Sequence, residues 1–408
     1  DQRMALLMGR GAQIGHGGHE KTGNHGLATD QITVRVNALE LIGGSGAQSY
    51  AQIGNGGYDA GGNFAGDICI HVETGVILDA NTQSGENAYV QIGHGGTLAG
   101  SAASTFNGKV VVTTGSGGVT LRGGDTAPTG QYAQIGHGGI STSGAMSGDL
   151  FVVADDGGDL TMTGGAGPQA YVMVGHGDGV GVVGDFDSGT SSGTRQGGIQ
   201  YFIDGDANIS NGVGGNAYLH HRTNTGGGLN LTTPTYLGGN GYQYVVNGTN
   251  TAPNSAFEGL DTMINGNIGT GHIVVTNLND IDYTYSGPDL LFNHDYDFIV
   301  MTGGNINLLS SYQNAGRGRA ILVAGWNGTV GSPATINLDA PCDPLIQPGT
   351  INFNDCDSFG NNGRIVTLGS VAQTKRVSFG SRQGLTAIAG YGLNVFSSNS
   401  TANGSTQV

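Results

Sequence analysis

The eight residues YAQIGHGG occupy Tyr132–Gly139, and close copies of them recur through the first half of the chain. The other copies are AQIGHGG at Ala12–Gly18, YAQIGNGG at Tyr50–Gly57, YVQIGHGG at Tyr89–Gly96 and YVMVGHGD at Tyr171–Asp178. Counted at Ala12, Ala51, Val90, Ala133 and Val172, the steps are 39, 39, 43 and 39 residues, and a degenerate sixth copy, NAYLHHR, stands at Asn216–Arg222. Such a constant step is typical of a repeat protein in which each unit stacks on the one before.

Two further strand patterns recur in a fixed order between the copies. The first is represented by Ile68, Ile70 and Val72, and the second by Val76 and Leu78. In each, apolar residues alternate with period two, as in a strand that buries one face, and clusters of Gly, Asn and Asp separate the patterns. The sequence therefore predicts an all-β fold, a parallel β-helix (β-solenoid) of three-stranded coils with one coil per repeat. Two smaller coils per repeat remain an alternative.

The segments between the third strand of one repeat and the first strand of the next vary in length. Examples are Gly95–Gly108 and Gly138–Gly148. We expect them to be loops that protrude from one edge. Past residue 222 the motif fades while short apolar strands continue, so we expect a regular β-helix over 1–222 and a less regular, loop-rich continuation of the same β-helix over 223–408.

Composition narrows the class of protein. The chain has 408 residues, of which 80 are glycine and only 11% are charged, and its net charge is −16. An acidic chain without basic patches is unsuited to nucleic acid or an anionic membrane surface. No stretch approaches the roughly 20 apolar residues that span a bilayer. We therefore expect no nucleic-acid partner and no membrane insertion, and the Asp1 start favours a processed, mature form.

The chain has three cysteines. Cys342 and Cys356 bracket a Pro-containing, loop-like segment, which predicts a small disulfide loop, with free thiols as the alternative. Cys69 lies in a strand pattern and is expected to be unpaired. A surface disulfide in a chain poor in lysine and rich in Asn, Ser and Thr favours an extracellular or cell-surface location.

The segment GGNINLLSSYQNAGRGRAILVAGWNG at Gly303–Gly328, together with the YAQIGHGG copies, resembles filamentous-haemagglutinin-type and related bacterial β-strand-repeat exoproteins. This resemblance implies a right-handed parallel β-helix on or outside the cell, acting in adhesion, matrix building or contact. The N-terminal secretion-signal domain of that family has no counterpart here, so the resemblance implies no secretion route.

Stacked repeats would align the equivalent residues of each motif copy into columns. The aromatic column is Tyr50, Tyr89, Tyr132, Tyr171 and Tyr218, and the amide column is Gln13, Gln52, Gln91 and Gln134. By alternation with the core residues, both columns are expected on the surface, where ring stacking and amide-to-amide hydrogen bonds strengthen the sheet. An exposed tyrosine column also suits stacking on sugars, so glycans or cell surfaces are a possible partner.

A third column contains the corner residues His16, Asn55, His94, His137 and His176. Imidazoles in a line offer one ligand each and do not converge on a point as a zinc site requires, and Asn55 interrupts them. We therefore interpret them as corner residues bonded to turn backbone, with metal binding as the alternative. Asp155, Asp156, Asp185 and Asp187 fit neither the Ca²⁺-binding nonapeptide repeat nor the EF-hand loop, and calcium at a turn stays an alternative.

Gly15–Gly23 lacks the order of a phosphate-binding loop. Glutamates and aspartates are scattered over non-equivalent positions, so no catalytic constellation is expected and we expect neither an enzyme nor a cofactor.

The two ends of the sequence predict how copies associate. The chain starts with a third-strand pattern and finishes after first- and second-strand patterns, so two copies could complete one coil between them. Head-to-tail contacts that do not close generate open filaments. The sequence therefore predicts a structural subunit of a bacterial extracellular filament, a homopolymer. The alternative is a passenger fragment of an adhesin that binds glycans or surfaces through loops and tyrosines.

Overall fold

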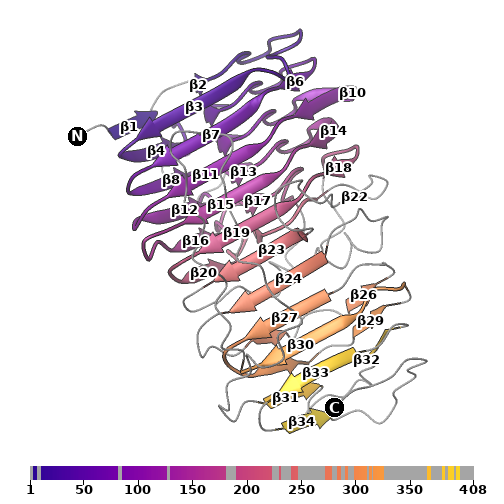
Figure 1. The fold of residues 1–408 in the computed structure, drawn as a ribbon. Helices are drawn as coiled ribbons and strands as arrows, with labels where there is room; N and C mark the ends of the chain where they lie inside the picture. The colour runs from indigo at the N-terminus through magenta and orange to yellow at the C-terminus, as the bar shows by residue number, and fades with distance from the viewer. Residues whose placement is uncertain are drawn as a thin grey trace.

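The computed structural model describes residues 3–6, 11–80, 85–125, 129–180 and 190–222. Farther along it describes 229–230, 240–246, 272–277, 283–285, 290–292, 298–309, 312–314, 316–325, 365–368, 379–381, 385–389 and 392–395. Every regular element in these ranges is a β-strand, and the paired strands run parallel. Figure 1 shows the strands stacked one above another, from the indigo N-terminal end to the yellow C-terminal end.

One sheet runs through the whole stack, and we name it the long sheet. It contains β3 (Gln31–Val36), β7 (Asp67–Val72), β11 (Val110–Thr114), β15 (Leu150–Ala154), β19 (Ile199–Ile203), β23 (Asn240–Val246), β24 (His272–Asn277), β27 (Phe298–Thr302), β30 (Ala320–Ala324) and β33 (Leu385–Ala389). It joins the regular repeats to the later strands.

Three further sheets lie beside the long sheet in the regular repeats. The second sheet contains β1 (Arg3–Leu6), β4 (Ala38–Ile42), β8 (Gly75–Asp79), β12 (Gly118–Arg122), β16 (Leu160–Thr163) and β20 (Ala207–Ser210). The motif sheet contains β2 (Ala12–Ile14), β5 (Ala51–Ile53), β9 (Val90–Ile92), β13 (Ala133–Ile135), β17 (Val172–Val174) and β21 (Ala217–Tyr218). The extra sheet contains β6 (Phe64–Ala65), β10 (Gly100–Asn107), β14 (Ser143–Ser147), β18 (Arg195–Gln196) and β22 (Leu229–Asn230).

The later strands form two shorter sheets beside the long sheet. One contains β25 (Tyr283–Tyr285), β28 (Ile306–Leu308), β31 (Ile365–Leu368) and β34 (Gly392–Val395). The other contains β26 (Leu290–Phe292), β29 (Tyr312–Asn314) and β32 (Phe379–Ser381). Among the described residues, each later layer thus adds a strand to at most three sheets, whereas a regular repeat adds strands to four.

The strand register shows that one repeat contributes one layer. Ala12 pairs with Ala51, Ala51 with Val90 and Val90 with Ala133, each one repeat apart. This arrangement is compatible with the predicted β-helix. The prediction of three strands per coil is wrong for the regular repeats, because Gly95–Gly108 and Gly138–Gly148 are not protruding loops but contain β10 and β14 of the extra sheet.

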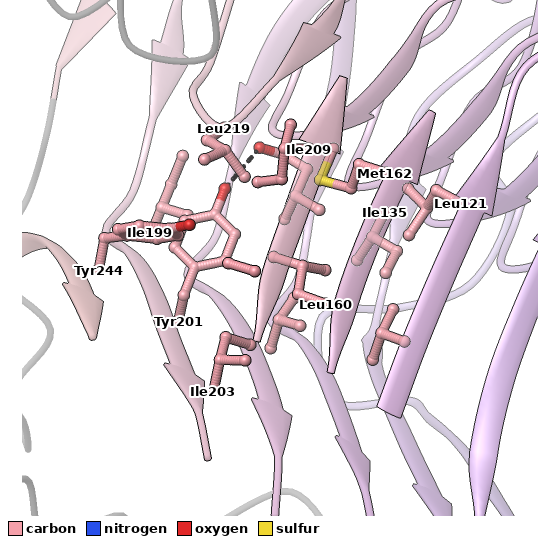
Figure 2. Close-up of a cluster of buried hydrophobic side chains, with 14 of the residues drawn as sticks. Leu121, Ile135, Leu160, Met162, Ile199, Tyr201, Ile203, Ile209, Leu219 and Tyr244 are labelled. Carbon is pink, nitrogen blue, oxygen red and sulfur yellow. Dashed lines mark hydrogen bonds between the residues drawn. The ribbon is translucent and has the colours of Figure 1, made fainter. Parts of the chain in front are cut away.

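In the regular repeats the main core lies between the inward faces of the long, second and motif sheets, whereas Phe64, Phe106 and Met146 of the extra sheet belong to a separate buried cluster. Figure 2 shows part of the main core, with Leu121, Ile135, Leu160 and Ile199 from different sheets packed together. The Tyr201 hydroxyl, also buried there, donates a hydrogen bond to the carbonyl oxygen of Val174 at 3.0 Å. Successive layers of branched side chains fill this interior, because a single repeat has no other surface on which to bury them.

The outer face of the long sheet is buried as well from β7 to β19, whereas it is exposed at β3. Val111, Phe151, Val153 and Phe202 alternate with core residues, yet each is at most 4% exposed. Cys69, on the same face, is fully buried and disulfide-bonded, so the expectation that it is unpaired is wrong. Cys342 and Cys356, the other two cysteines of the chain, lie outside the described residues. A disulfide bond of Cys69 within the chain uses one of them, so it excludes their predicted pairing with each other.

Candidate functional site: the stacked motif columns

The glycines of the motif set the distance between repeats. Gly136 has φ of +134°, which L side chains rarely adopt, and a Cβ there would collide with the carbonyl oxygen of Gly175 in the next repeat. Gly139 also has a positive φ, of +136°, and a Cβ there would collide with the Tyr132 hydroxyl of its own repeat and with the backbone of Gly96 in the preceding one. The motif therefore fixes close backbone contact between layers and a pocket for the tyrosine within a layer.

The histidines form a continuous stack inside the protein. The centroids of His94 and His137 lie 4.7 Å apart, those of His137 and His176 4.6 Å, and those of His176 and His221 4.5 Å, with the rings within 8° of parallel. These spacings match the distance between neighbouring strands of a sheet. We call His94, His137, His176 and His221 the histidine column.

Each imidazole of the histidine column uses both ring nitrogens. The backbone N–H of His94 donates to Nδ1 of His137 at 3.0 Å, and Nε2 of His137 lies 2.8 Å from the carbonyl oxygen of Gly108. Because Nδ1 accepts a hydrogen bond and a carbonyl can only accept, the proton must be on Nε2. The same pair of bonds recurs at His94, His176 and His221.

Asn55 takes the place of a histidine in the second copy and also uses one acceptor and one donor, although its donor bond stays within its own repeat. Its Oδ1 accepts from the backbone N–H of His16 at 2.7 Å, and its Nδ2 donates to the carbonyl of Ala65 at 2.8 Å. Oδ1 thus replaces Nδ1 and Nδ2 replaces Nε2–H. The exchange indicates that the position requires one acceptor and one donor rather than a metal ligand.

Burial keeps these imidazoles neutral. It lowers the pKa of His94 to about 4 and that of His221 to about 3. For His137 and His176 it moves the pKa well below the ordinary value, and neighbouring imidazoles lower it further. A neutral imidazole is the form that can accept at Nδ1 while donating at Nε2.

His221 is a column member that the sequence interpretation missed. The register pairs Val172 with Ala217, which places His221 level with His176. The sixth copy, NAYLHHR, contains two histidines, and only alignment on Ala217 distinguishes them. His16, at the other end, is exposed. Within the described residues no group of three or more His, Cys, Asp or Glu is arranged to hold a metal ion.

The tyrosines of successive repeats stack on one another as predicted, but the stack is buried instead of lying on the surface. Tyr50, Tyr89, Tyr132 and Tyr171 lie with successive centroids 5.1, 4.9 and 4.7 Å apart, and all four are at most 3% exposed. The expectation of a surface column, and with it the stacking of sugars on these rings, is therefore wrong. Tyr58, Ile140 and Val180, which follow the motif glycines, belong to the same buried cluster.

Tyr218 does not continue the tyrosine column, which corrects its predicted place. It pairs with Met173, the residue at the glutamine position, while Asn216 lies level with Tyr171. The guanidinium of Arg222 lies 4.2 Å from the centre of the Tyr218 ring. The sixth copy is therefore shifted by two residues relative to the sequence interpretation.

The glutamines bond to backbone rather than to one another, so the prediction of amide-to-amide bonds is wrong. Nε2 of Gln91 donates to the carbonyls of Gly136 and Gly138 in the next repeat, at 2.9 and 3.0 Å. Equivalent pairs of bonds extend from Gln13, Gln52 and Gln134. Gln52, Gln91 and Gln134 are fully buried, and Gln13 is partly exposed at the end of the column.

We expect Gln91→Glu to be more destabilising than Gln91→Met. Methionine leaves the carbonyl of Gly136 without its donor, at a cost of about 1–3 kcal/mol, and a methionine already occupies this position as Met173. Glutamate adds a buried negative charge that faces two carbonyl oxygens. Urea unfolding of both variants at neutral pH measures the difference. Equal stability of the two variants would contradict the assigned direction of these hydrogen bonds.

Two buried arginines lie where the regular columns end. Arg195 pairs with Met146 in the extra sheet and donates to the carbonyls of Gly144, Ser192, Thr194 and Arg222 and to the Ser191 hydroxyl. Burial lowers its pKa to about 10, a value at which it stays charged at neutral pH. Arg222 occupies the glycine position level with Gly177, and its Nη1 donates to the carbonyls of Asp178 and Val180.

Asp178 is the carboxylate of this buried group. Its oxygens accept from the backbone N–H groups of Val180, Thr190 and Ser191 and from the Thr190 hydroxyl. These bonds join the two sides of the segment between Val180 and Thr190. The group thus satisfies buried polar atoms where the motif sheet ends, and its contacts indicate a structural role.

No protein-family model, curated protein or solved structure matches this chain. The resemblance to haemagglutinin-type exoproteins therefore stays a prediction. In the part of the chain that the structure describes, no helix is long and apolar enough to cross a membrane.

Proposed function

We propose that the chain is a right-handed parallel β-helix that serves as a structural subunit of an extracellular filament, extended by end-to-end stacking of copies. The observation that carries this proposal is the open edge at each end of the long sheet. Among the described residues, its outermost strands β3 and β33 each pair on one side only. Unpaired strand edges are templates for further strands.

The first layer also leaves apolar side chains incompletely covered. Ile14, Ile32 and Val36 pack against the core but remain partly exposed, whereas their partners Ile53, Ile68 and Val72 in the next layer are at most 5% exposed. A further layer would bury this end in the same way. Apolar burial of this kind stabilises contacts by about 25 cal/mol per Å².

The first described strand, β1, pairs with β4 and so lies in the second sheet rather than in the motif sheet, where the sequence placed the start of the chain. The last described strands, β33 and β34, lie in the long sheet and its neighbour. In our proposal, two copies meet through the outermost strands of these sheets. The disulfide bond of Cys69 supports an oxidising, extracellular location.

Thr33→Pro tests the open edge of β3. Thr33 is exposed and aligns with Cys69. The N–H groups of Asp67, two residues before Cys69, and of Glu73, four residues after it, donate to the preceding layer. By this alternation the Thr33 N–H points away from β7, so proline removes a donor that only a new neighbour would use. We expect Thr33→Pro to shorten or abolish filaments in electron micrographs of concentrated protein at neutral pH.

Thr33→Ala is the matched control, because it keeps the N–H and should leave the filaments intact. Circular dichroism and thermal unfolding should show that both variants are folded. If the wild-type protein gives only dispersed short rods at high concentration, or if Thr33→Pro assembles as the wild type does, end-to-end pairing through β3 is wrong.

A further inference from the structure

The histidine column joins successive repeats through bonds that only neutral imidazoles can make. At each column histidine, a backbone N–H of the preceding repeat donates to Nδ1, and Nε2–H donates to a carbonyl just before a strand of the long sheet. A proton added to Nδ1 would point at the backbone N–H from which Nδ1 now accepts a hydrogen bond. Protonation therefore removes the bond and sets two donors against each other.

We propose that the histidine column is an acid-labile seam: its imidazoles take up protons when the contacts between successive repeats from Asn55 to His221 open, so that acid favours the separated repeats. The inference concerns the cohesion of layers within one chain and does not depend on filament assembly. It rests on four stacked rings with eight hydrogen bonds of the same pattern.

The charges around the column favour the neutral form in the folded protein. Neighbouring imidazoles lower the pKa of His137 and His176. The charge of Arg195 lowers further the pKa of His176 and His221. At the turns that hold the acceptor carbonyls, the next residues are Asp67, Lys109 and Asp149. Burial raises the pKa of Asp149, whose Oδ1 accepts from the backbone of Gly198. The remaining charged groups near the end of the column are Asp178 and Arg222.

The direction of the pH effect follows from these values. An unfolded histidine titrates near 6.5, whereas His94 and His221 in the folded protein have pKa values of about 4 and 3. The stabilisation by neutral imidazoles is therefore complete above pH 6.5 and is lost as the pH falls through the range from 6.5 to 3. Near pH 5 each column histidine takes up about one proton when the chain unfolds.

The test is the pH dependence of unfolding, in two variants that change the column by one histidine in opposite directions. The unfolding equilibrium constant is measured in denaturant at several pH values between 5 and 6. One proton of uptake corresponds to a tenfold change of this constant per pH unit. We expect His137→Asn, which copies the natural Asn55, to reduce the uptake by about one proton, and Asn55→His to increase it by about one.

A second measurement uses the unaltered protein and so does not depend on how the variants fold. Nuclear magnetic resonance of histidine labelled with ¹⁵N reports the tautomer and the pKa of each ring. We expect four imidazoles in the Nε2–H form that stay neutral at pH 5. Proton uptake that is the same in both variants and the wild type would overturn the proposal. So would a column histidine in the folded protein that titrates near 6.5.

Discussion

Gly136→Ala is expected to prevent the regular repeats from folding, with a loss of about 5 kcal/mol or more in the free energy of unfolding. The methyl group would collide with the carbonyl oxygen of Gly175, and φ of +134° is itself strained for an L residue. The backbone cannot move away, because Gly136 N–H donates to the carbonyl of Ile92 on its other side. Thermal unfolding and the yield of soluble protein measure the effect.

Gly157→Ala is the matched control for backbone conformation alone. Gly157 also has a positive φ, of +76°, but a Cβ there would meet nothing within 4 Å. We expect a loss of about 1–2 kcal/mol, the ordinary cost of a left-handed conformation. Similar losses in the two variants would show that close contact between repeats is not what the motif glycine provides.

His137→Ala is expected to destabilise the protein by about 4 kcal/mol at neutral pH. The variant leaves the backbone N–H of His94 and the carbonyl of Gly108 without partners in the interior, and it removes one ring from a stack of four. Equilibrium unfolding in urea at pH 7.5 measures the loss. At this pH the column imidazoles are neutral, so the measurement isolates packing and hydrogen bonding.

The control is His137→Asn in the same conditions. Asn55 shows that an amide can accept from the backbone N–H of the preceding repeat and donate to a carbonyl, that of Ala65 in its own repeat. We expect the asparagine variant to lose about half as much stability as the alanine variant, because it keeps the first bond but not the ring stack. An asparagine variant as unstable as the alanine variant would contradict the assigned roles of Nδ1 and Nε2.

The period of the fold could be predicted from the sequence, because apolar alternation and a constant step both survive in the primary structure. Alternation assigns Ala133 and Ile135 to the core, and both are fully buried. The extra sheet could not be predicted, since its strands Gly100–Asn107 and Ser143–Ser147 contain mostly small and polar residues. Each has one large apolar side chain that is fully buried, Phe106 and Met146, and a single residue shows no period.

The surroundings of the tyrosines and glutamines were predicted wrongly for a related reason. Alternation places Tyr132 and Gln134 opposite the core, and a simple strand would leave that side to solvent. The motif glycines instead precede residues, such as Ile140, that join the buried tyrosine cluster. Period two indicates which residues share a side of a strand, but it does not indicate what covers that side.

The long sheet has a mechanical consequence. Among the described residues, the second, motif and extra sheets end at β20, β21 and β22, and the two shorter sheets begin only at β25 and β26. Between these points, the strand pairing that the structure describes continues from layer to layer only in the long sheet, through β19, β23 and β24 (Figure 1). The long sheet therefore transmits a pulling force along the stack from the regular repeats to the later strands.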